Sequence, residues 1–452
     1  MAFRNLIKQS ACAVALSFAL AACTTVATDT PAVEVPDAPV AADVSDAPVV
    51  ADAAAFSAEG IAALEATMGA YIADRRLYGI HTRLAHKGET VSDYKAGLRG
   101  LMTQKPIEDD TIYRIYSMTK PITGVAMMML WEEGKYKLDD PVTKYVPEFE
   151  GLKVLKGVAE DGSPILVDSE RAPTMREVMS HTAGFAYGLG GADPANQAFR
   201  DNEIMRAPDM QTFINKVADV PLLFQPGEHW SYSASVDIQG HIIEKLSGQK
   251  FSEFLDQRLF TPLGMTDTGF YVPEEDYDRF SEVYGFNPEN GQLVPVPYPN
   301  VMFKKETVAF ESGGGGLVST MDDYGQFAQM LVNDGELNGI RFLKPETMDV
   351  MTKNVLTEGQ SLSSLGTNAG ETYPGLGMGL NVGTIEDSAA VPTEIPAGSY
   401  FWGGAASTWF WIDPVNDLYF IGMVQIFERG NPGEDLELRE TSGTLVYEAL
   451  ND

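Results

Sequence analysis

The sequence has little cysteine, little histidine and few basic residues. Its 452 residues include two cysteines, Cys12 and Cys23, and Cys12 falls in a segment that we expect to be removed, so the mature chain can form no internal disulfide. The five histidines show no His-Glu-x-x-His or other ligand spacing. We therefore expect no metal and no cofactor.

Basic residues are scarce as well: the chain has 32 basic and 64 acidic residues, which gives a formal net charge of -32. Such a surface repels nucleic acids and anionic lipid headgroups, so we expect no nucleic-acid partner. Hydrophobic residues make up 44% of the chain, which suffices for a large core divided between two lobes.

The N-terminus carries an export signal. Arg4 and Lys8 precede an apolar run over residues 11–22 that is too short to span a bilayer. The run ends in Leu20-Ala-Ala-Cys23, which resembles the lipobox of bacterial lipoproteins and implies a signal peptide over residues 1–23 with Cys23 as the lipidated residue. Thr24 is similar to the residue that follows the cysteine in outer-membrane lipoproteins, so we expect an anchored protein facing the periplasm. The alternative is an ordinary cleaved signal.

Residues 24–55 resemble a spacer, since they are rich in Ala, Val, Pro and Asp, with six acidic residues and no basic one. We expect a disordered linker there and a folded catalytic domain over residues 56–452. Hydrophobic spacing within that domain predicts helices over residues 57–76, 117–133 and 436–450, and strands over residues 82–86, 90–95, 400–402, 408–413 and 418–426.

Residues 140–310 read as a mostly helical insertion. We therefore predict an α+β fold in which both ends of the domain share one sheet.

A Ser-x-x-Lys pattern occurs three times, as Ser92/Lys95, Ser117/Lys120 and Ser247/Lys250. The first pair lies in a predicted strand, where residues three apart point to opposite faces. The third pair straddles a glycine at a helix end. Ser117 alone opens an apolar helix, whose i, i+3 spacing places Ser117 and Lys120 on one face.

A serine hydroxyl becomes a good nucleophile when a neighbouring base takes its proton, and a buried lysine can be that base. The alternative is that Ser117 is a helix N-cap and Lys120 a solvated side chain. A Ser/His/Asp triad is not indicated, because no Gly-x-Ser-x-Gly turn surrounds any serine. We expect His181 to be a structural hydrogen-bonding residue at a helix end.

The segment Tyr113-Arg-Ile-Tyr-Ser-Met-Thr-Lys-Pro-Ile122 resembles the active-site helix of class C β-lactamases and family VIII carboxylesterases. Further matching segments follow in the family's order over about residues 56–450: 178–184, 224–234, 262–269, 313–320 and 402–405. The resemblance implies a β-lactamase and transpeptidase-like fold, with an antiparallel sheet flanked by terminal helices and a mostly helical lobe. It also implies a serine hydrolase that works through an acyl-enzyme.

That family uses a Tyr-x-Asn element as its second proton carrier, and Tyr232-Ser-Ala matches it at the tyrosine. Tyr298-Pro-Asn is a formal rival in a proline-rich loop. A phenol near a lysine ammonium can be held as phenolate, so we predict that Tyr232 relays the proton between Ser117 and the leaving group.

The family's Lys-Thr-Gly element is replaced by Trp402-Gly403-Gly404, as in family VIII carboxylesterases. The resemblance makes the amides of Ser117 and Ala405 an oxyanion hole. Without a cation for a substrate carboxylate, the sequence favours a carboxylesterase on small or short-chain esters. The alternatives are a β-lactamase or D-amino-acid peptidase acting on cell-wall-like amides, and an inactive penicillin-binding-like lipoprotein.

Overall fold

The computed structural model describes residues 55–189, 193–287, 289–296, 303–308, 310–358, 360–362, 373–428, 431 and 436–451. The predicted signal peptide, Cys23 and residues 24–54 of the predicted linker lie outside these ranges, as does the rival Tyr298. Among the described helices, none is long and apolar enough to cross a membrane.

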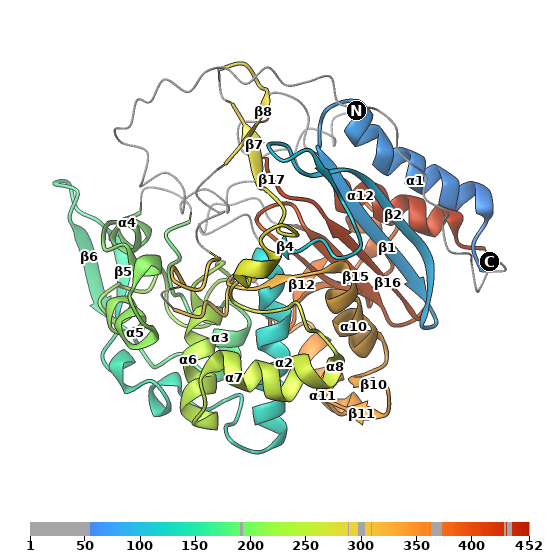
Figure 1. Cartoon of the computed structure of the whole chain (residues 1–452). Coiled ribbons are helices and arrows are strands. Elements are labelled where there is room, and N and C mark those ends of the chain that lie inside the picture. Colours follow the sequence, from blue (N-terminus) through green and yellow to red (C-terminus); the bar gives the residue numbers. More distant parts are fainter. Residues whose placement is uncertain are drawn as a thin grey trace.

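An eight-stranded antiparallel sheet forms one side of the molecule (Figure 1). Its strands, in spatial order, are β12 (Leu376–Met378), β13 (Gly383–Ile385), β14 (Tyr400–Gly403), β15 (Trp409–Asp413), β16 (Leu418–Met423), β1 (Gly79–His86), β2 (Glu89–Gly100) and β3 (Lys105–Pro106). The first strand of the domain pairs with one of its last, since β1 lies antiparallel to β16 with His81 opposite Met423. The prediction that both ends share one sheet is confirmed.

Alternating side chains divide β15 between two cores. Trp409 and Trp411 face α1 (Ala58–Ala73) and α12 (Leu438–Ala449), which pack together on the outer face (Figure 1). Phe410 and Ile412 point the other way, into the large core shared with the second lobe. Both faces of the strand are buried, which explains why the sequence shows an unbroken apolar run there.

The second lobe is built around α2 (Thr119–Glu132), whose residues from Thr119 to Leu130 are all buried. The remaining helices of this lobe and of the inner face of the sheet are α3 (Met175–Met179), α4 (Pro194–Asp201), α5 (Met210–Ala218), α6 (Ser235–Ser247), α7 (Phe251–Leu255), α8 (Thr261–Leu263), α10 (Met321–Val332) and α11 (Pro345–Thr352). The lobe is mostly helical, as predicted.

Small sheets interrupt the helices of this lobe. One hairpin consists of β5 (Lys153–Val158) and β6 (Pro164–Asp168), and a three-stranded sheet combines β7 (Tyr284–Phe286), β8 (Leu293–Pro295) and β17 (Ile426–Phe427). The predicted strand over residues 418–426 is therefore divided into β16 and β17. Gln425 lies at the break, where its amide group bonds both the N–H and the carbonyl of Arg114.

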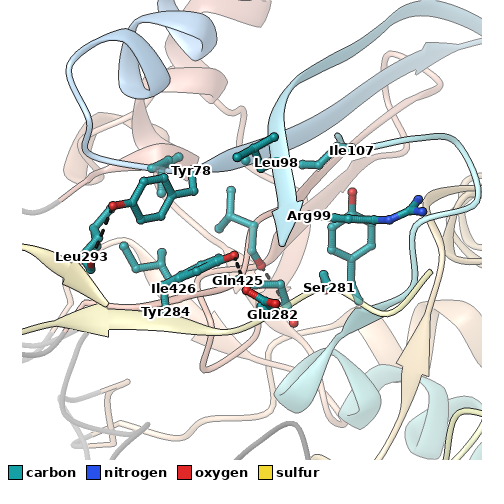
Figure 2. A pocket seen from close by; sticks show the side chains of 14 residues that line it. Tyr78, Leu98, Arg99, Ile107, Ser281, Glu282, Tyr284, Leu293, Gln425 and Ile426 are labelled. Carbon is teal, nitrogen blue, oxygen red and sulfur yellow. Dashed lines mark hydrogen bonds between the residues drawn. The ribbon is translucent and has the colours of Figure 1, made fainter. Parts of the chain in front are cut away.

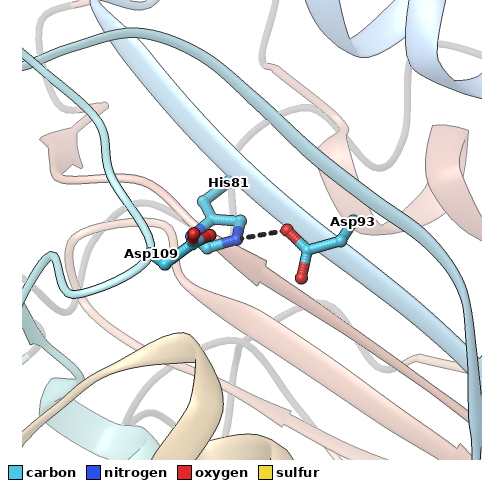
Figure 3. A group of neighbouring side chains, drawn as sticks. All are labelled: His81, Asp93 and Asp109. Carbon is cyan, nitrogen blue, oxygen red and sulfur yellow. Dashed lines mark hydrogen bonds and ion pairs between the residues drawn. The ribbon is translucent and has the colours of Figure 1, made fainter. Parts of the chain in front are cut away.

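A charged cluster lies between the first hairpin and the loop after β3, where the ligand atoms of His81, Asp93 and Asp109 come within 4.8 Å of one another (Figure 3). Asp93 accepts hydrogen bonds from His81 (2.9 Å), Lys95 (3.0 Å) and Arg83 (2.6 Å). Lys95 also pairs with Asp109. Two cations already neutralise these carboxylates, so the donor set suits an ion-pair network better than a metal ion.

We expect Asp93→Asn to lower the free energy of unfolding by about 2 kcal/mol at pH 7, because it removes the buried carboxylate that Arg83 and Lys95 share, leaving them only their exposed partners Asp322 and Asp109. Burial would raise the pKa of Asp93, but His81, Arg83 and Lys95 outweigh burial and hold it well below its usual value. A lowered carboxyl pKa stabilises the fold above pH ~4 and loses this effect as the pH falls further. Urea unfolding at pH 7 and pH 3.5 measures both effects; an equal difference at the two values would contradict the network.

Candidate active site

Ser117 lies in a short 3-10 turn, η2 (Tyr116–Met118), directly before α2. Its neighbour Tyr116 has a φ of 42°, which is unusual for a residue with a side chain. The Tyr116 ring is held between Phe303 and Phe427, with ring centroids 5.9 and 5.8 Å away. The α-helix thus begins two residues later than predicted, and the strained turn presents the Ser117 hydroxyl.

Lys120 reaches Ser117 from the first turn of α2, as the spacing predicts. Its Nζ lies 3.3 Å from Ser117 Oγ and donates a hydrogen bond to the Gly314 carbonyl at 2.6 Å. The side chain is fully buried, and burial lowers its pKa to about 7 against the opposing charge of Asp237. A large fraction of Lys120 is therefore the neutral amine at neutral pH, the form that can accept a proton.

Tyr232 approaches Ser117 from another side and donates its hydroxyl to Ser117 Oγ at 2.7 Å. Lys120 Nζ lies 4.5 Å from the centre of the Tyr232 ring. Burial raises the pKa of Tyr232 above its ordinary value, and the hydrogen bonds with Ser117 and Trp402 only partly oppose this. Burial therefore favours the neutral phenol over the phenolate in the resting site, and the proton relay through Tyr232 stays a prediction.

An aromatic stack holds Tyr232 in place. Its ring lies 5.1 Å from the His181 ring and 6.0 Å from the Trp402 ring, both at 19° between planes. His181 follows α3 and shares a hydrogen bond of 2.9 Å between its Nδ1 and Ser233 Oγ. Burial, aided by the charge of Lys120, puts the pKa of His181 well below its usual value. The predicted hydrogen bonding of His181 just after a helix end is confirmed, while its purely structural role stays a prediction.

The end of β14 lies against the segment that leads to Ser117. A Cβ atom on Gly404 would lie 2.5 Å from the Ile115 carbonyl oxygen and 2.1 Å from Thr408 Oγ1, so only glycine fits there. Ala405 follows and packs with Tyr116 in one small apolar cluster. The structure thus brings Trp402, Gly403, Gly404 and Ala405 to Ser117, while the oxyanion role of the Ala405 amide stays a prediction.

We expect Gly404→Ala to lower kcat about 10-fold with little change in KM, because the added methyl group must displace the backbone beside the nucleophile. Gly157→Ala is the matched control, since a Cβ there would meet no atom within 4 Å. Steady-state kinetics on both variants checks this. Equal activity of the two variants would mean that close backbone contact at Gly404 is unimportant.

Sequence reasoning missed the groups behind Lys120. The glycines over residues 313–316 entered the prediction only as part of the family-like segment 313–320, yet the Gly314 carbonyl binds Lys120. Its N–H donates to Asp237 Oδ1 at 3.1 Å, and Ser312 donates to the same oxygen. Asp237 is completely buried in the first turn of α6. Its position five residues after Tyr232 was the only signal, and no spacing rule links the two.

A separate crevice lies between the first hairpin and the sheet of β7 and β17 (Figure 2). Its lining includes neither Ser117, Lys120 nor Tyr232. Its polar groups are engaged within the protein: Gln425 binds Arg114, and Glu282 accepts bonds from the Met102 N–H and the Tyr284 hydroxyl. The crevice is therefore separate from the Ser117 site, and its Gln425 and Glu282 side chains already form bonds within the protein.

Known proteins share this fold and sequence pattern. Residues 64–442 match the family described as beta-lactamase. Esterase EstB of Burkholderia gladioli is 31% identical over 367 residues, covering 77% of this chain and 86% of its own. Lovastatin esterase of Penicillium rubens is 30% identical over 360 residues, covering 75% and 86%.

Among solved structures, simvastatin synthase (LovD) from Aspergillus terreus superimposes with a TM-score of 0.74 at 20% identity, covering 86% of this chain and 98% of its own. The family match covers most of the chain, and the sequence identity with EstB is 31%, which together establish the family to which the chain belongs. The chain belongs to the beta-lactamase family of serine-hydrolase-type enzymes, in the part of it that includes esterases and acyltransferases.

Proposed function

We propose that this protein is a carboxylesterase that works through an acyl-enzyme on Ser117. The observation that carries the proposal is the convergence of two different proton carriers on one hydroxyl, with Lys120 Nζ at 3.3 Å and the Tyr232 hydroxyl at 2.7 Å from Ser117 Oγ. A serine that merely capped a helix would need neither a buried amine nor a buried phenol beside it.

In the acylation step, the neutral Lys120 amine takes the Ser117 proton while Oγ attacks the ester carbonyl. The amides of Ser117 and Ala405 hold the oxyanion. Tyr232, kept as the neutral phenol by burial, is placed to donate its proton to the departing alcohol and to regain one from Lys120. Water then attacks the acyl-enzyme, and the proton transfers run in reverse.

The strand end that faces Ser117 favours a neutral substrate. Trp402 and Gly403 at the end of β14, with Gly404 directly after them, offer an indole ring and backbone groups but no positively charged side chain. A substrate carboxylate would find no charged partner on these residues, whereas a small ester needs none. This supports esters over β-lactams and over cell-wall-like amides, the activities that we keep as alternatives.

A panel of p-nitrophenyl esters from acetate to octanoate, measured beside nitrocefin and a D-alanyl-D-alanine peptide, tests the proposal. We expect the highest kcat/KM on the shorter esters. A fluorophosphonate should add one adduct mass to the protein, and peptide mapping should locate it on Ser117. Absence of both turnover and adduct would favour the inactive lipoprotein instead.

Acyl transfer to an alcohol is the second candidate, because the same intermediate serves both reactions. The relatives include an acyltransferase, calJ of Penicillium decumbens, which is 26% identical over 346 residues. Adding a primary alcohol to the ester assay distinguishes the two. An acyltransferase releases more p-nitrophenol and forms a new ester, while a strict hydrolase forms only the acid.

We also propose that the protein is exported and anchored by lipid on Cys23, on the outer membrane facing the periplasm. The support is the lipobox-like Leu20-Ala-Ala-Cys23 and the following Thr24. Mass measurement of the mature N-terminus should find a lipidated cysteine, and Cys23→Ser should move the protein from the membrane fraction to the periplasm. An unlipidated mature N-terminus would end this proposal.

A further inference from the structure

Asp237 forms a buried link to Lys120 through a single glycine. Gly314 accepts a hydrogen bond from Lys120 at its carbonyl (2.6 Å) and donates one from its N–H to Asp237 Oδ1 (3.1 Å). Lys120 and Asp237 are both completely buried. A positive and a negative side chain therefore bind opposite polar groups of the same residue, in a place without solvent to screen them.

The space around this link is filled. A Cβ on Gly314 would lie 2.5 Å from Asp237 Oδ2 and 2.7 Å from the Tyr187 hydroxyl, so a larger residue cannot stand between the carboxylate and the lysine. Ser312 donates to Asp237 Oδ1, the oxygen that also receives the Gly314 N–H. Burial raises the pKa of Asp237 above its usual value, while the charge of Lys120 and the two donors on one oxygen oppose burial and favour the ionised carboxylate.

We propose that Asp237 is a positioning residue of this site: its carboxylate fixes the Gly314 carbonyl on Lys120, and its charge stabilises the ammonium that forms when Lys120 takes the proton of Ser117 Oγ. The proton moves from Oγ to Nζ as the new bond from Oγ to the acyl carbon forms. This inference rests on the proposed hydrolase function.

The other titratable groups near the pair are Tyr187, Tyr232 and His181. Burial keeps all three neutral, since it raises the pKa of both tyrosines and lowers that of the histidine. Asp237 is thus the only negative charge that acts on Lys120 among the described residues. Removing that charge should lower the pKa of Lys120 from about 7 and weaken the amine as a base.

The test is the pH profile of kcat/KM for Asp237→Asn on p-nitrophenyl acetate. The wild-type profile should fall on the acid side near pH 7, where Lys120 becomes protonated. In the variant we expect a kcat/KM about 10-fold lower at the plateau and an acid limb moved down by about one pH unit. The rate of fluorophosphonate labelling of Ser117 should show the same shift without ester turnover.

Asp323→Asn is the matched control, because Asp323 is also a buried carboxylate but binds Thr268 and the Asp267 N–H instead. We expect its profile to match that of the wild type. An acid limb in Asp237→Asn that is unmoved, or moved to higher pH, would overturn the inference even if the rate falls.

If Asp237→Asn does not fold, Ser312→Ala is the second variant: the loss of one donor to Asp237 destabilises the ionised carboxylate, so the acid limb should move in the same direction but less far, and a limb moved to higher pH would overturn the inference. A wild-type protein without turnover or adduct would instead overturn the proposed function.

Discussion

Ser117→Ala should abolish ester hydrolysis, with kcat lowered by at least about 10⁴-fold, and should remove the fluorophosphonate adduct entirely. Ser117 Oγ is the proposed acceptor of the acyl group, because the side chains of Lys120 and Tyr232 both contact it. Loss of a nucleophile leaves only the binding and oxyanion contributions to the reaction. Steady-state assays with p-nitrophenyl acetate and intact-protein mass after labelling measure the two effects.

Ser247→Ala is the control for this variant, because Ser247 belongs to another Ser-x-x-Lys match in the chain. Ser247 Oγ only accepts a bond from the Gln249 N–H at the end of α6. Its substitution should leave turnover and labelling unchanged. Substantial residual turnover in Ser117→Ala, with the adduct retained elsewhere, would show that a different residue is the nucleophile.

Local spacing was enough to place the pair Ser117 and Lys120. Residues three apart in a helical turn have neighbouring side chains, so the spacing of the motif is enough to predict that Ser117 and Lys120 lie close together. The hairpin of β1 and β2 was likewise predictable, since two strand-like runs lie close together in the sequence and a turn containing Gly88 joins them. Recognition of the family added Tyr232 and the residues at the end of β14.

Groups that meet through the fold were not predictable in the same way. Gly314 lies 194 residues from Lys120, and Asp237 77 residues from Gly314, so no periodicity connects them. The protonation state of Tyr232 also could not be predicted from the sequence, because it depends on how completely the ring is buried. The sequence also did not predict the break between β16 and β17. The break depends on hydrogen bonds between the Gln425 side chain and the Arg114 backbone, which is far away in the chain.

Lys120→Met should lower kcat/KM by about 10³-fold while changing the free energy of unfolding by no more than about 2 kcal/mol. Methionine has a similar length but no proton-accepting group, so Ser117 loses its base. The stability change is small because two effects oppose each other. The Gly314 carbonyl loses its partner, but a buried amine is also removed from a site where its charged form is disfavoured.

Lys120→Arg distinguishes a base from a fixed positive charge. Arginine keeps the charge beside Ser117 but cannot release its proton, so we expect it to be as inactive as Lys120→Met. Lys250→Met, at an exposed lysine of the third Ser-x-x-Lys match, should retain full activity. Urea unfolding of each variant confirms that the loss is chemical. Near-normal turnover in a folded Lys120→Arg would assign Lys120 an electrostatic role and leave Tyr232 as the base, which would require the phenolate that burial disfavours.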